Sequence, residues 1–406
     1  MSGKSVGIVG ARGIGNYGGY ERMLVDLVPR LVQKGYDIRC SCEQPDDEEG
    51  TANYKGAKLD YFPLQPPANY TLRKAYELLY DSYFIMTYSL VCDIVYVLGI
   101  YGGLSLLIPR VLGKEVIVNT DGLEWKRAKY NVVEQGLIVL FFVISINLAS
   151  RIIVDNEQLK QFIGERHHFK TSYVPYGVSQ QKQQPWDEPK LTKYVREYWD
   201  ETKLSSYVNE NAASGKVREG EYWLVVARLE PENNIDVIID GFVKARPNYP
   251  LVIVGDFTSG KYRDRVYTLA FNGNTASIFF LGAIYDAGLL GMLRQYCFAY
   301  IHGHSVGGTN PSLLEAMICE NLIVSHDNVF NRELCGRYAH YFSNSADFSD
   351  LVSKLEMSAG KSSEFGSEVY KRAIAGYSWD SVLASHEEVL RGDICPMPRT
   401  ERETEA

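Results

Sequence analysis

Residues 304–315 (HSVGGTNPSLLE) bring together groups that suit the binding of phosphates. Gly307 and Gly308 leave the backbone free to approach an anion closely. Thr309 and Asn310 are candidate helix caps, and Pro311 suits the first turn of the helix that they would begin. Amide groups at the start of a helix are unpaired and point toward a bound anion. The segment therefore predicts a diphosphate site around Gly308, Thr309 and Asn310.

Glu315 lies about one turn further along the same predicted helix, among apolar residues. A carboxylate in such a setting needs a partner, because burying an unpaired charge is unfavourable. A ribose would offer two neighbouring hydroxyl donors to one carboxylate. An internal ion pair with an arginine is the structural alternative.

Arg228 is a second candidate for phosphate binding. It lies in residues 226–234 (VARLEPENN), which run from a predicted strand into a helical turn near Pro231. Its guanidinium could bind a pyrophosphate through two parallel hydrogen bonds and offset the charge of a leaving phosphate. The structural alternative is an ion pair at a domain boundary or on the surface.

A glycine-rich turn near the N-terminus is a third candidate phosphate site. Gly18 and Gly19, with Arg12, could contact a phosphate or a sugar next to the positive end of a helix. Glu21 would stabilise the helix start or contact an acceptor. Two alternatives stay open. The turn could bind a dinucleotide cofactor, with Glu43 on the ribose, although its spacing is GxxGxG rather than GxGxxG; or it could bind nothing.

Residues 119–129 (NTDGLEWKRAK) follow a predicted strand and carry further polar candidates. Asp121 should project from the carboxyl end of that strand, where it could position a sugar hydroxyl or an acceptor. Glu124 is a second acceptor-side candidate, and Trp125 offers a flat apolar face for a sugar ring. The alternative is a helix-capping aspartate beside a core tryptophan.

The elements that must position these residues alternate between strands and helices. Runs rich in β-branched residues separated by helical patterns indicate parallel sheets with crossover helices. The predicted strands of the first half are residues 5–9, 37–42, 59–62, 94–98, 115–119, 151–154 and 171–174. Those of the second half are residues 222–227, 251–254, 278–281, 299–302, 323–325 and 339–342.

We therefore predict an α/β protein of two Rossmann-like, doubly wound domains facing each other across a cleft, with ligands at the carboxyl ends of the strands. The expected division is a first α/β domain over residues 1–178, a hinge and insert over 179–220, a second α/β domain over 221–376, and a C-terminal helix with a polar tail over 377–406.

Composition limits the class of protein and its partners. The 406 residues carry a net charge of −8, which argues against nucleic-acid binding. The seven cysteines show no zinc-binding spacing, and no acidic pair lies in a loop suited to a metal. We expect a cytoplasmic protein without a signal peptide, a metal or another cofactor.

Two apolar stretches raise the question of a membrane. Residues 83–99 are interrupted by Asp93, and residues 136–149 are shorter than the roughly 20 residues that a spanning helix needs. We expect 136–149 to form a buried helix. Shallow contact with the inner face of the cell membrane stays open as an alternative.

Taken together, these motifs resemble glycosyltransferase family 4, which has the GT-B fold. The resemblance rests on the segments ARLEPENN, VGDF, FLGAIYD and GGTNPSLLEAM, and it covers nearly the whole chain. The N-terminal GIGNYGGYER and NTDGLEWKRAK resemble a subgroup described as rhamnosyltransferases of polysaccharide assembly.

The resemblance implies a role for each matching residue. Arg228 would bind the donor diphosphate, and Glu315 would hold the ribose as the second glutamate of the family motif. The backbone around Gly308, Thr309 and Asn310 would meet the phosphates and the sugar. Ala283 and Tyr285 would line the base pocket. Gly18 and Gly19 would face the phosphates from the first domain.

Two positions depart from the family pattern. The first glutamate of the motif is replaced by Gly307, so another group such as His304 or Asn310 would contact the donor sugar. The family lysine is replaced by Asn233, which leaves one positive charge fewer at the diphosphate. Both changes favour an unusual donor, for which a deoxysugar such as rhamnose is one hypothesis.

The sequence therefore predicts a hexosyltransferase-type enzyme that uses a UDP- or dTDP-sugar and a glycan or lipid-linked acceptor. We expect Asp121, Arg228 and Asn310 to act in catalysis without a metal, and the resemblance implies retention of anomeric configuration. The alternatives are a nucleotide-sugar epimerase, a nicotinamide-dependent oxidoreductase, and a non-catalytic protein that binds sugar nucleotides.

Overall fold

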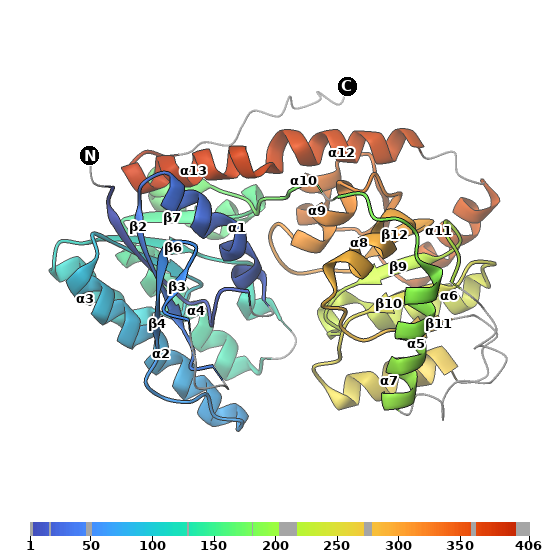
Figure 1. The fold of residues 1–406 in the computed structure, drawn as a ribbon, viewed down its shortest axis with the longest axis horizontal. Helices are drawn as coiled ribbons and strands as arrows, with labels where there is room; N and C mark the ends of the chain where they lie inside the picture. The colour runs from blue at the N-terminus through green and yellow to red at the C-terminus, as the bar shows by residue number, and fades with distance from the viewer. Residues whose placement is uncertain are drawn as a thin grey trace. The chain divides into compact units, whose positions relative to one another are not determined.

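A computed structural model describes residues 3–15, 18–45, 51–127, 130–180, 182–202, 217–271, 278–358 and 363–394. These residues form two compact units (Figure 1). Unit 1 comprises residues 1–177, 307–309 and 377–406, and unit 2 comprises residues 178–306 and 310–376. The predicted hinge is described only at 179–180, 182–202 and 217–220, and two residues of the 119–129 motif, 128 and 129, lie outside the described residues.

Unit 1 contains a sheet with the strand order β3-β4-β2-β1-β5-β6-β7-β8, in which only β3 pairs antiparallel. Its strands are β1 (Ser5–Val9), β2 (Asp37–Cys42), β3 (Asn53–Tyr54), β4 (Ala57–Tyr61), β5 (Ile94–Leu98), β6 (Glu115–Asn119), β7 (Arg151–Val154) and β8 (Thr171–Tyr173).

Helices connect and flank these strands (Figure 1). The α-helices are α1 (Gly19–Gln33), α2 (Tyr70–Val91), α3 (Leu107–Val111), α4 (Val132–Leu148) and α13 (Trp379–Arg391). The 3-10 helices are η1 (Gly103–Leu106), η2 (Glu124–Lys126), η3 (Glu157–Phe162) and η4 (Glu165–Lys170).

Unit 2 contains an all-parallel sheet with the strand order β11-β10-β9-β12-β13-β14. Its strands are β9 (Trp223–Val226), β10 (Leu251–Val254), β11 (Ile278–Phe280), β12 (Ala299–His302), β13 (Ile323–His326) and β14 (His340–Phe342). The helices are α5 (Glu188–Thr202), η6 (Pro231–Asn233), α6 (Ile235–Ala245), α7 (Gly260–Phe271), α8 (Ala287–Gln295), α9 (Pro311–Met317), α10 (Val329–Cys335), α11 (Ser345–Met357) and α12 (Ser363–Tyr377).

The core of unit 2 explains why this sheet forms. Trp223, Val225, Ile253 and Ile301 point from neighbouring strands into one buried cluster, where Phe242 of α6 covers them. Such strands are buried on both faces, so their sequences are continuous apolar runs rather than alternating ones. The predicted fold class is confirmed: the chain has two Rossmann-like α/β units with parallel sheets.

The expectation of a buried helix at residues 136–149 is only half right. Helix α4 buries Ile138 and Phe142, but Leu137 and Leu140 on its other side are exposed. The residues of this helix are apolar on nearly every side, so their pattern could not show which side is covered. Among the described helices, none is long and apolar enough to span a membrane.

Candidate donor site

Two loops that follow adjacent strands of unit 2 are tied together by hydrogen bonds. Strands β9 and β12 are parallel neighbours, so their carboxyl ends lie at the same edge of the sheet. The Asn234 side-chain amide donates to the Gly303 carbonyl at 2.7 Å, and the Ser305 N–H donates to the Glu232 carbonyl at 2.9 Å. A Cβ on Gly303 would lie 2.1 Å from the Asn233 carbonyl oxygen, so only glycine permits this approach. Residues 228–234 and 303–305 therefore form one surface.

Arg228 lies two residues beyond β9 and keeps an exposed guanidinium. Its side chain is 45 % exposed, and its Nη2 lies 3.9 Å from Glu230 Oε2, which is a long ion pair. The chain then enters η6 with Pro231 in its first turn, as the sequence predicted. Arg228 is thus positioned at a strand end with its charge accessible to an anion.

Asn233, which takes the place of the family lysine, has a structural contact. It is buried, and its side-chain amide donates to the Arg228 carbonyl at 2.6 Å. This bond holds the backbone of Arg228 in place. Whether Asn233 also contacts a donor stays a prediction.

The predicted helix start after β12 is present, with one difference. Asn310 caps α9, since its Oδ1 accepts from the Ser312 N–H at 3.0 Å, and Pro311 follows as the first helical residue. Thr309 is no cap. Its hydroxyl donates to the Asp155 carbonyl and its N–H to Asp155 Oδ2 at 3.2 Å, and residues 307–309 belong to unit 1.

Glu315 is held by an arginine that the sequence did not single out. Arg294 Nη2 of α8 lies 2.6 Å from Glu315 Oε2. The Arg294 side chain is 5 % exposed and that of Glu315 is 25 % exposed. The internal ion pair named as an alternative is therefore present, and it fixes a carboxylate that still reaches solvent.

Two histidines at the end of β12 stack on each other. The ring centroids of His302 and His304 are 4.3 Å apart with planes inclined by 9°. Burial, followed by the neighbouring His304 and His326, holds the pKa of His302 well below its usual range, so this imidazole is neutral at pH 7. Burial also lowers the pKa of His326. None of these contacts was foreseen from the sequence.

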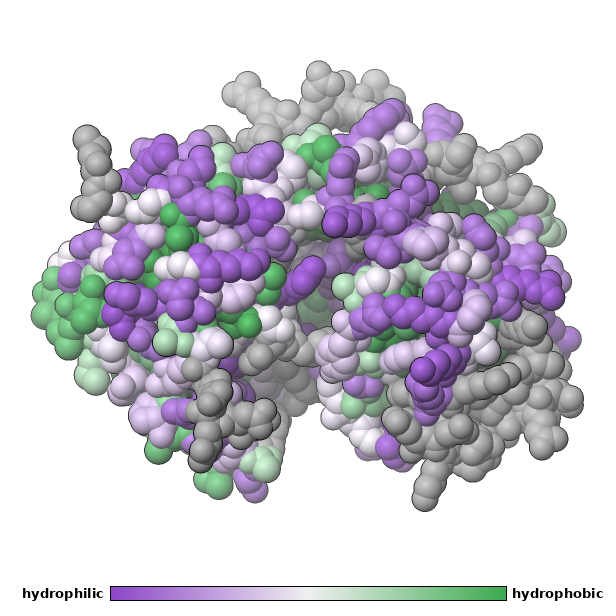
Figure 2. All heavy atoms as spheres, in the orientation of Figure 1, coloured by the Kyte–Doolittle hydropathy of each residue, from purple (hydrophilic) through white to green (hydrophobic). Residues whose placement is uncertain are grey.

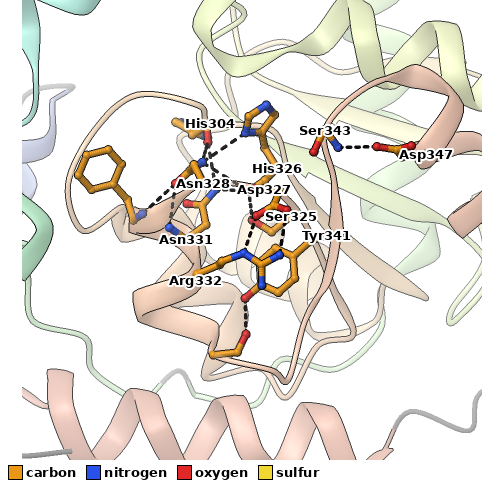
Figure 3. Close-up of polar contacts among 12 residues, drawn as sticks. His304, Ser325, His326, Asp327, Asn328, Asn331, Arg332, Tyr341, Ser343 and Asp347 are labelled. Atoms are coloured by element: carbon orange, nitrogen blue, oxygen red, sulfur yellow. Dashed lines mark hydrogen bonds and ion pairs between the residues drawn. The ribbon is translucent and has the colours of Figure 1, made fainter. Parts of the chain in front are cut away.

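The backbone of His304 is held by side chains at the start of α10, as Figure 3 shows. Its carbonyl accepts from the side-chain amides of Asn328 at 2.9 Å and Asn331 at 3.0 Å. Asn331 also donates to the His326 carbonyl at 2.9 Å, and Asn328 caps α10. The loop after β12 is therefore braced by the start of α10.

The two candidates for a base pocket, Ala283 and Tyr285, follow β11. The Ala283 N–H donates to Asp256 Oδ1 at 3.0 Å, and its carbonyl accepts from the Tyr194 hydroxyl at 3.2 Å. Tyr285 is 74 % exposed. The VGDF and FLGAIYD segments thus meet through the Asp256 side chain, and Tyr194 of α5 joins them.

In unit 1, the glycine-rich turn is occupied by internal contacts. Glu21 is buried and accepts from the Arg12 N–H at 3.0 Å, and a Cβ on Gly18 would lie 1.9 Å from its other carboxylate oxygen. The Arg12 guanidinium binds Asp81 at 3.2 Å and lies over the Tyr80 ring. Arg12 therefore has a structural role, and Gly18 and Gly19 remain the phosphate candidates of this turn.

Glu43, the ribose candidate of the dinucleotide alternative, is also taken up by an ion pair. Arg73 Nη2 lies 2.6 Å from its Oε1. This pairing removes one support for a dinucleotide cofactor.

Asp121 follows β6 in a left-handed backbone conformation, with φ of 56°. Its N–H donates to Asn119 Oδ1 at 3.2 Å, and the Tyr20 hydroxyl lies 3.5 Å from the same oxygen. Burial, and next the Asp121 carboxylate, raise the pKa of Tyr20 and Tyr176 well above the usual range, so both phenols stay protonated. Asp121 does not cap a helix, because η2 begins three residues later.

The two acceptor-side candidates of η2 are packed into unit 1. Glu124 is buried, lies 2.6 Å from Arg127 Nη2 and accepts from the Tyr130 hydroxyl at 3.2 Å. Trp125 packs against Phe142, with ring centroids 4.8 Å apart. These contacts match the core alternative for Trp125; acceptor binding by either residue stays a prediction.

Asp155, Tyr20 and Tyr176 are polar residues near Asp121 that the sequence did not single out. Asp155 could have been found from the sequence, because it directly follows β7. Asp121 follows β6 in a similar way, with one residue between them. The two tyrosines come from α1 and from the segment after β8, and only the fold brings them to this place.

Comparisons with known proteins agree with this geometry. Residues 208–372 match the family described as "Glycosyl transferases group 1", and residues 3–179 match a "Domain of unknown function (DUF1972)". No curated protein matches the chain.

Solved structures share the fold at low sequence identity. Sucrose-phosphate synthase of Thermosynechococcus elongatus aligns with a TM-score of 0.72 at 13 % identity, covering 96 % of this chain and 98 % of that chain. Anabaena Alr3699/HepE in complex with UDP and glucose aligns with a TM-score of 0.67 at 14 % identity, covering 96 % and 99 %. An alpha,alpha-trehalose-phosphate synthase (UDP-forming) from Burkholderia vietnamiensis aligns with a TM-score of 0.66 at 11 % identity, covering 96 % and 99 %.

These likenesses show the GT-B fold. The match of residues 208–372 identifies a glycosyltransferase domain of group 1 type. The prediction of a hexosyltransferase-type enzyme is thereby confirmed.

Proposed function

We propose that this chain, with its group 1 glycosyltransferase domain, transfers a sugar from a UDP- or dTDP-sugar to a glycan or lipid-linked acceptor. One observation carries the proposal. At the ends of the adjacent strands β9 and β12, unit 2 presents an exposed guanidinium on Arg228 and, on α9, the Glu315 carboxylate oriented by Arg294. These are the groups that a diphosphate and a ribose require.

Arg228 offsets the charge of the leaving diphosphate in this proposal. A fixed cation near the developing negative charge stabilises the transition state more than the ground state. Asn310 and the backbone of Gly308 and Thr309 are proposed to contact the phosphates and the sugar, and Ala283 and Tyr285 the base. Transfer would then need no metal, and adding EDTA should leave turnover unchanged.

A uridine nucleotide is the first donor to test, because Anabaena Alr3699/HepE, which shares the fold, was solved in complex with UDP and glucose. Membership of glycosyltransferase family 4, the rhamnosyltransferase subgroup and retention of configuration are also part of the proposal. They rest on the motif resemblance and on Gly307, which removes a carboxylate from the sugar end of the site.

Unit 1 is proposed to take the acceptor. Asp121 is the proposed catalytic group there, with Gly18 and Gly19 near the donor phosphates. Glu21, Glu124 and Trp125 are the acceptor-side candidates. A lipid-linked acceptor would bring the protein to the inner face of the cell membrane.

A panel of radiolabelled UDP-, dTDP- and GDP-sugars tests the proposal, with turnover measured with and without a lipid-linked glycan acceptor. Transfer of label to the acceptor, with the free nucleotide as second product, is the expected result. Conversion of the sugar nucleotide without any acceptor would instead indicate an epimerase. If no donor is turned over and no donor shifts the thermal midpoint, the proposal is overturned and a non-catalytic role remains.

A further inference from the structure

A patch of apolar side chains is exposed on unit 1. Short helices η1 and α3 carry most of it, and Figure 2 shows hydrophobic residues gathered at the edge where Figure 1 draws α2 and α3. Val111 is 83 % exposed and Phe169, in η4, is 72 % exposed. Large contiguous apolar patches on a protein surface mark interaction sites. The apolar patch consists of Leu104, Leu107, Ile108, Val111, Leu112 and Phe169.

Helix α4 extends this patch. It packs directly on η1, since a Cβ on Gly103 would lie 2.7 Å from the Phe141 ring. Leu137 and Leu140, one turn apart on α4, are each about half exposed. The exposed side of α4 is therefore apolar, like most of the exposed residues of the nearby α3.

Three cations lie where α4 ends. Arg110 of α3 donates to Ser150 Oγ at 2.9 Å, Lys170 donates to the Ala149 carbonyl at 2.7 Å, and Arg166 donates to Asn147 Oδ1 at 3.4 Å. In the part of the chain that the structure describes, none of the three pairs with a carboxylate. Phe169 of the apolar patch lies between two of them in η4.

Arg110 and Arg166 both lie close enough to Lys170 to act on its charge. Burial lowers the pKa of Lys170, and the neighbouring Arg110 and Arg166 lower it further. Glu165, next to Arg166, is exposed and forms no ion pair among the described residues. An anion at this position would relieve a repulsion that the protein itself leaves in place.

We infer that the apolar patch, the exposed side of α4 and the cations Arg110, Arg166 and Lys170 form a docking surface for a bilayer that contains anionic phospholipid. Apolar side chains would enter the boundary between headgroups and acyl chains, while the cations contact phosphate groups at the surface. Charge complementarity favours this occupant, because a second copy of the chain would bring the same unpaired cations. The inference extends the proposed use of a lipid-linked acceptor, but binding to lipid needs no donor sugar.

Vesicle flotation without nucleotide tests the inference. The wild-type chain should bind phosphatidylcholine vesicles that contain phosphatidylglycerol more tightly than vesicles of phosphatidylcholine alone, and salt should weaken this preference. The double variant Arg110→Gln/Arg166→Gln should lose about fivefold in partitioning per removed charge. Leu107→Ser/Val111→Ser should reduce partitioning to both vesicles.

Matched controls lie in unit 2. Lys261→Gln removes an exposed cation there, and Met357→Ser removes a side chain that is 78 % exposed; neither should change partitioning. Equal binding to both vesicle types overturns the inference, as does vesicle binding that neither the double arginine variant nor Leu107→Ser/Val111→Ser reduces. The inference is also overturned if the wild-type chain is a dimer in solution and Leu107→Ser/Val111→Ser makes it monomeric. Vesicle binding by a protein without donor turnover would contradict the proposed function alone.

Discussion

Arg294 and Glu315 join α8 to α9 through an ion pair, with Nη2 and Oε2 2.6 Å apart. Arg294 is nearly buried, so its charge depends on Glu315 for compensation. The pair leaves the other carboxylate oxygen of Glu315 to accept from a ligand. One interaction thus serves both the packing of unit 2 and the proposed ribose contact.

Replacing Glu315 tests the ribose contact. Glu315→Gln keeps the shape of the side chain and removes its charge, so we expect UDP affinity to fall at least about tenfold, since hydrogen bonds to charged groups contribute about 1.5–3 kcal/mol. Isothermal titration calorimetry with UDP measures this. Glu368→Gln is the matched control, because Glu368 is also ion-paired and is 29 % exposed. Equal loss in both variants would contradict a ribose role for Glu315.

Removing Arg294 should affect stability first. Arg294→Met leaves the Glu315 carboxylate without its cation, and because this carboxylate is 25 % exposed the free energy of unfolding should fall by about 1–2 kcal/mol, less than for a fully buried unpaired charge. Urea unfolding measures this change. The double variant Arg294→Met/Glu315→Gln should lose less than the sum of the two single variants. Strict additivity would mean that the two side chains do not interact in solution.

Arg228 should matter for the donor but not for folding. Its side chain is 45 % exposed, and among the described residues its one ion pair is the long contact to Glu230, so Arg228→Ala should leave the thermal midpoint unchanged. We expect weaker UDP binding by about tenfold and a larger loss in turnover, because the charge of the diphosphate grows in the transition state. Arg263→Ala, at 50 % exposure in the same unit, is the control. Unchanged donor binding in Arg228→Ala would mean that the diphosphate lies elsewhere.

Asp121 allows a substitution that changes charge alone. Its backbone has φ of 56°, a conformation that asparagine tolerates well. Asp121→Asn should therefore keep the fold and the affinity for UDP, while transfer to the acceptor falls about 100-fold, within the range of acid–base contributions. Asp121→Ala should lose the same activity and also some stability. Wild-type turnover in Asp121→Asn would remove this residue from the reaction.

His304 is the candidate for the contact that Gly307 cannot make. We expect His304→Ala to weaken binding of the sugar nucleotide about tenfold while UDP binds as before, because the ring would meet the sugar and not the nucleotide. His340→Ala, which also removes a ring stacked on a neighbour, is the control. Gly307→Glu should not restore a family-like site, since φ of 148° at this position disfavours any side chain. Equal losses of affinity for UDP and for the sugar nucleotide would exclude a sugar-specific role for His304.

His386 predicts a pH dependence of stability. Burial lowers its pKa to about 4, from 6.5 in the unfolded chain. Above pH 6.5 the imidazole is neutral in both states. Between pH 6.5 and about 4 only the unfolded chain binds the proton, so the free energy of unfolding decreases as the pH falls, by about 3 kcal/mol from this group. In His386→Gln, measured by urea unfolding across this pH range, the free energy of unfolding should depend less on pH than in the wild-type chain. The same pH dependence in both would contradict the prediction.

The strands could be predicted closely from the sequence. Ser5–Val9, Leu251–Val254 and Ala299–His302 have the predicted bounds, because each is a short, mostly apolar run that ends at or just before a polar residue or glycine. The cap at Asn310 and the turn at Pro231 were equally readable, since both depend on neighbouring residues only.

Contacts between distant residues could not be read in this way. Arg294 lies on another helix than Glu315, and Thr309 turned out to bind Asp155 rather than to cap α9. Helix α4 was expected to be buried, yet one side of it is exposed, since hydrophobicity alone does not say which surface covers a helix. These outcomes depend on tertiary packing, which overrides local signals.

Gly303 has a consequence for reading other sequences. The loops after β9 and β12 approach so closely there that a Cβ would lie 2.1 Å from the Asn233 carbonyl oxygen. A chain of this architecture with any larger residue at the equivalent position must therefore route its first loop differently. Its arginine could then not be equated with Arg228 by alignment alone. A glycine at this position is thus one condition for carrying the proposed phosphate contact of Arg228 over to another chain.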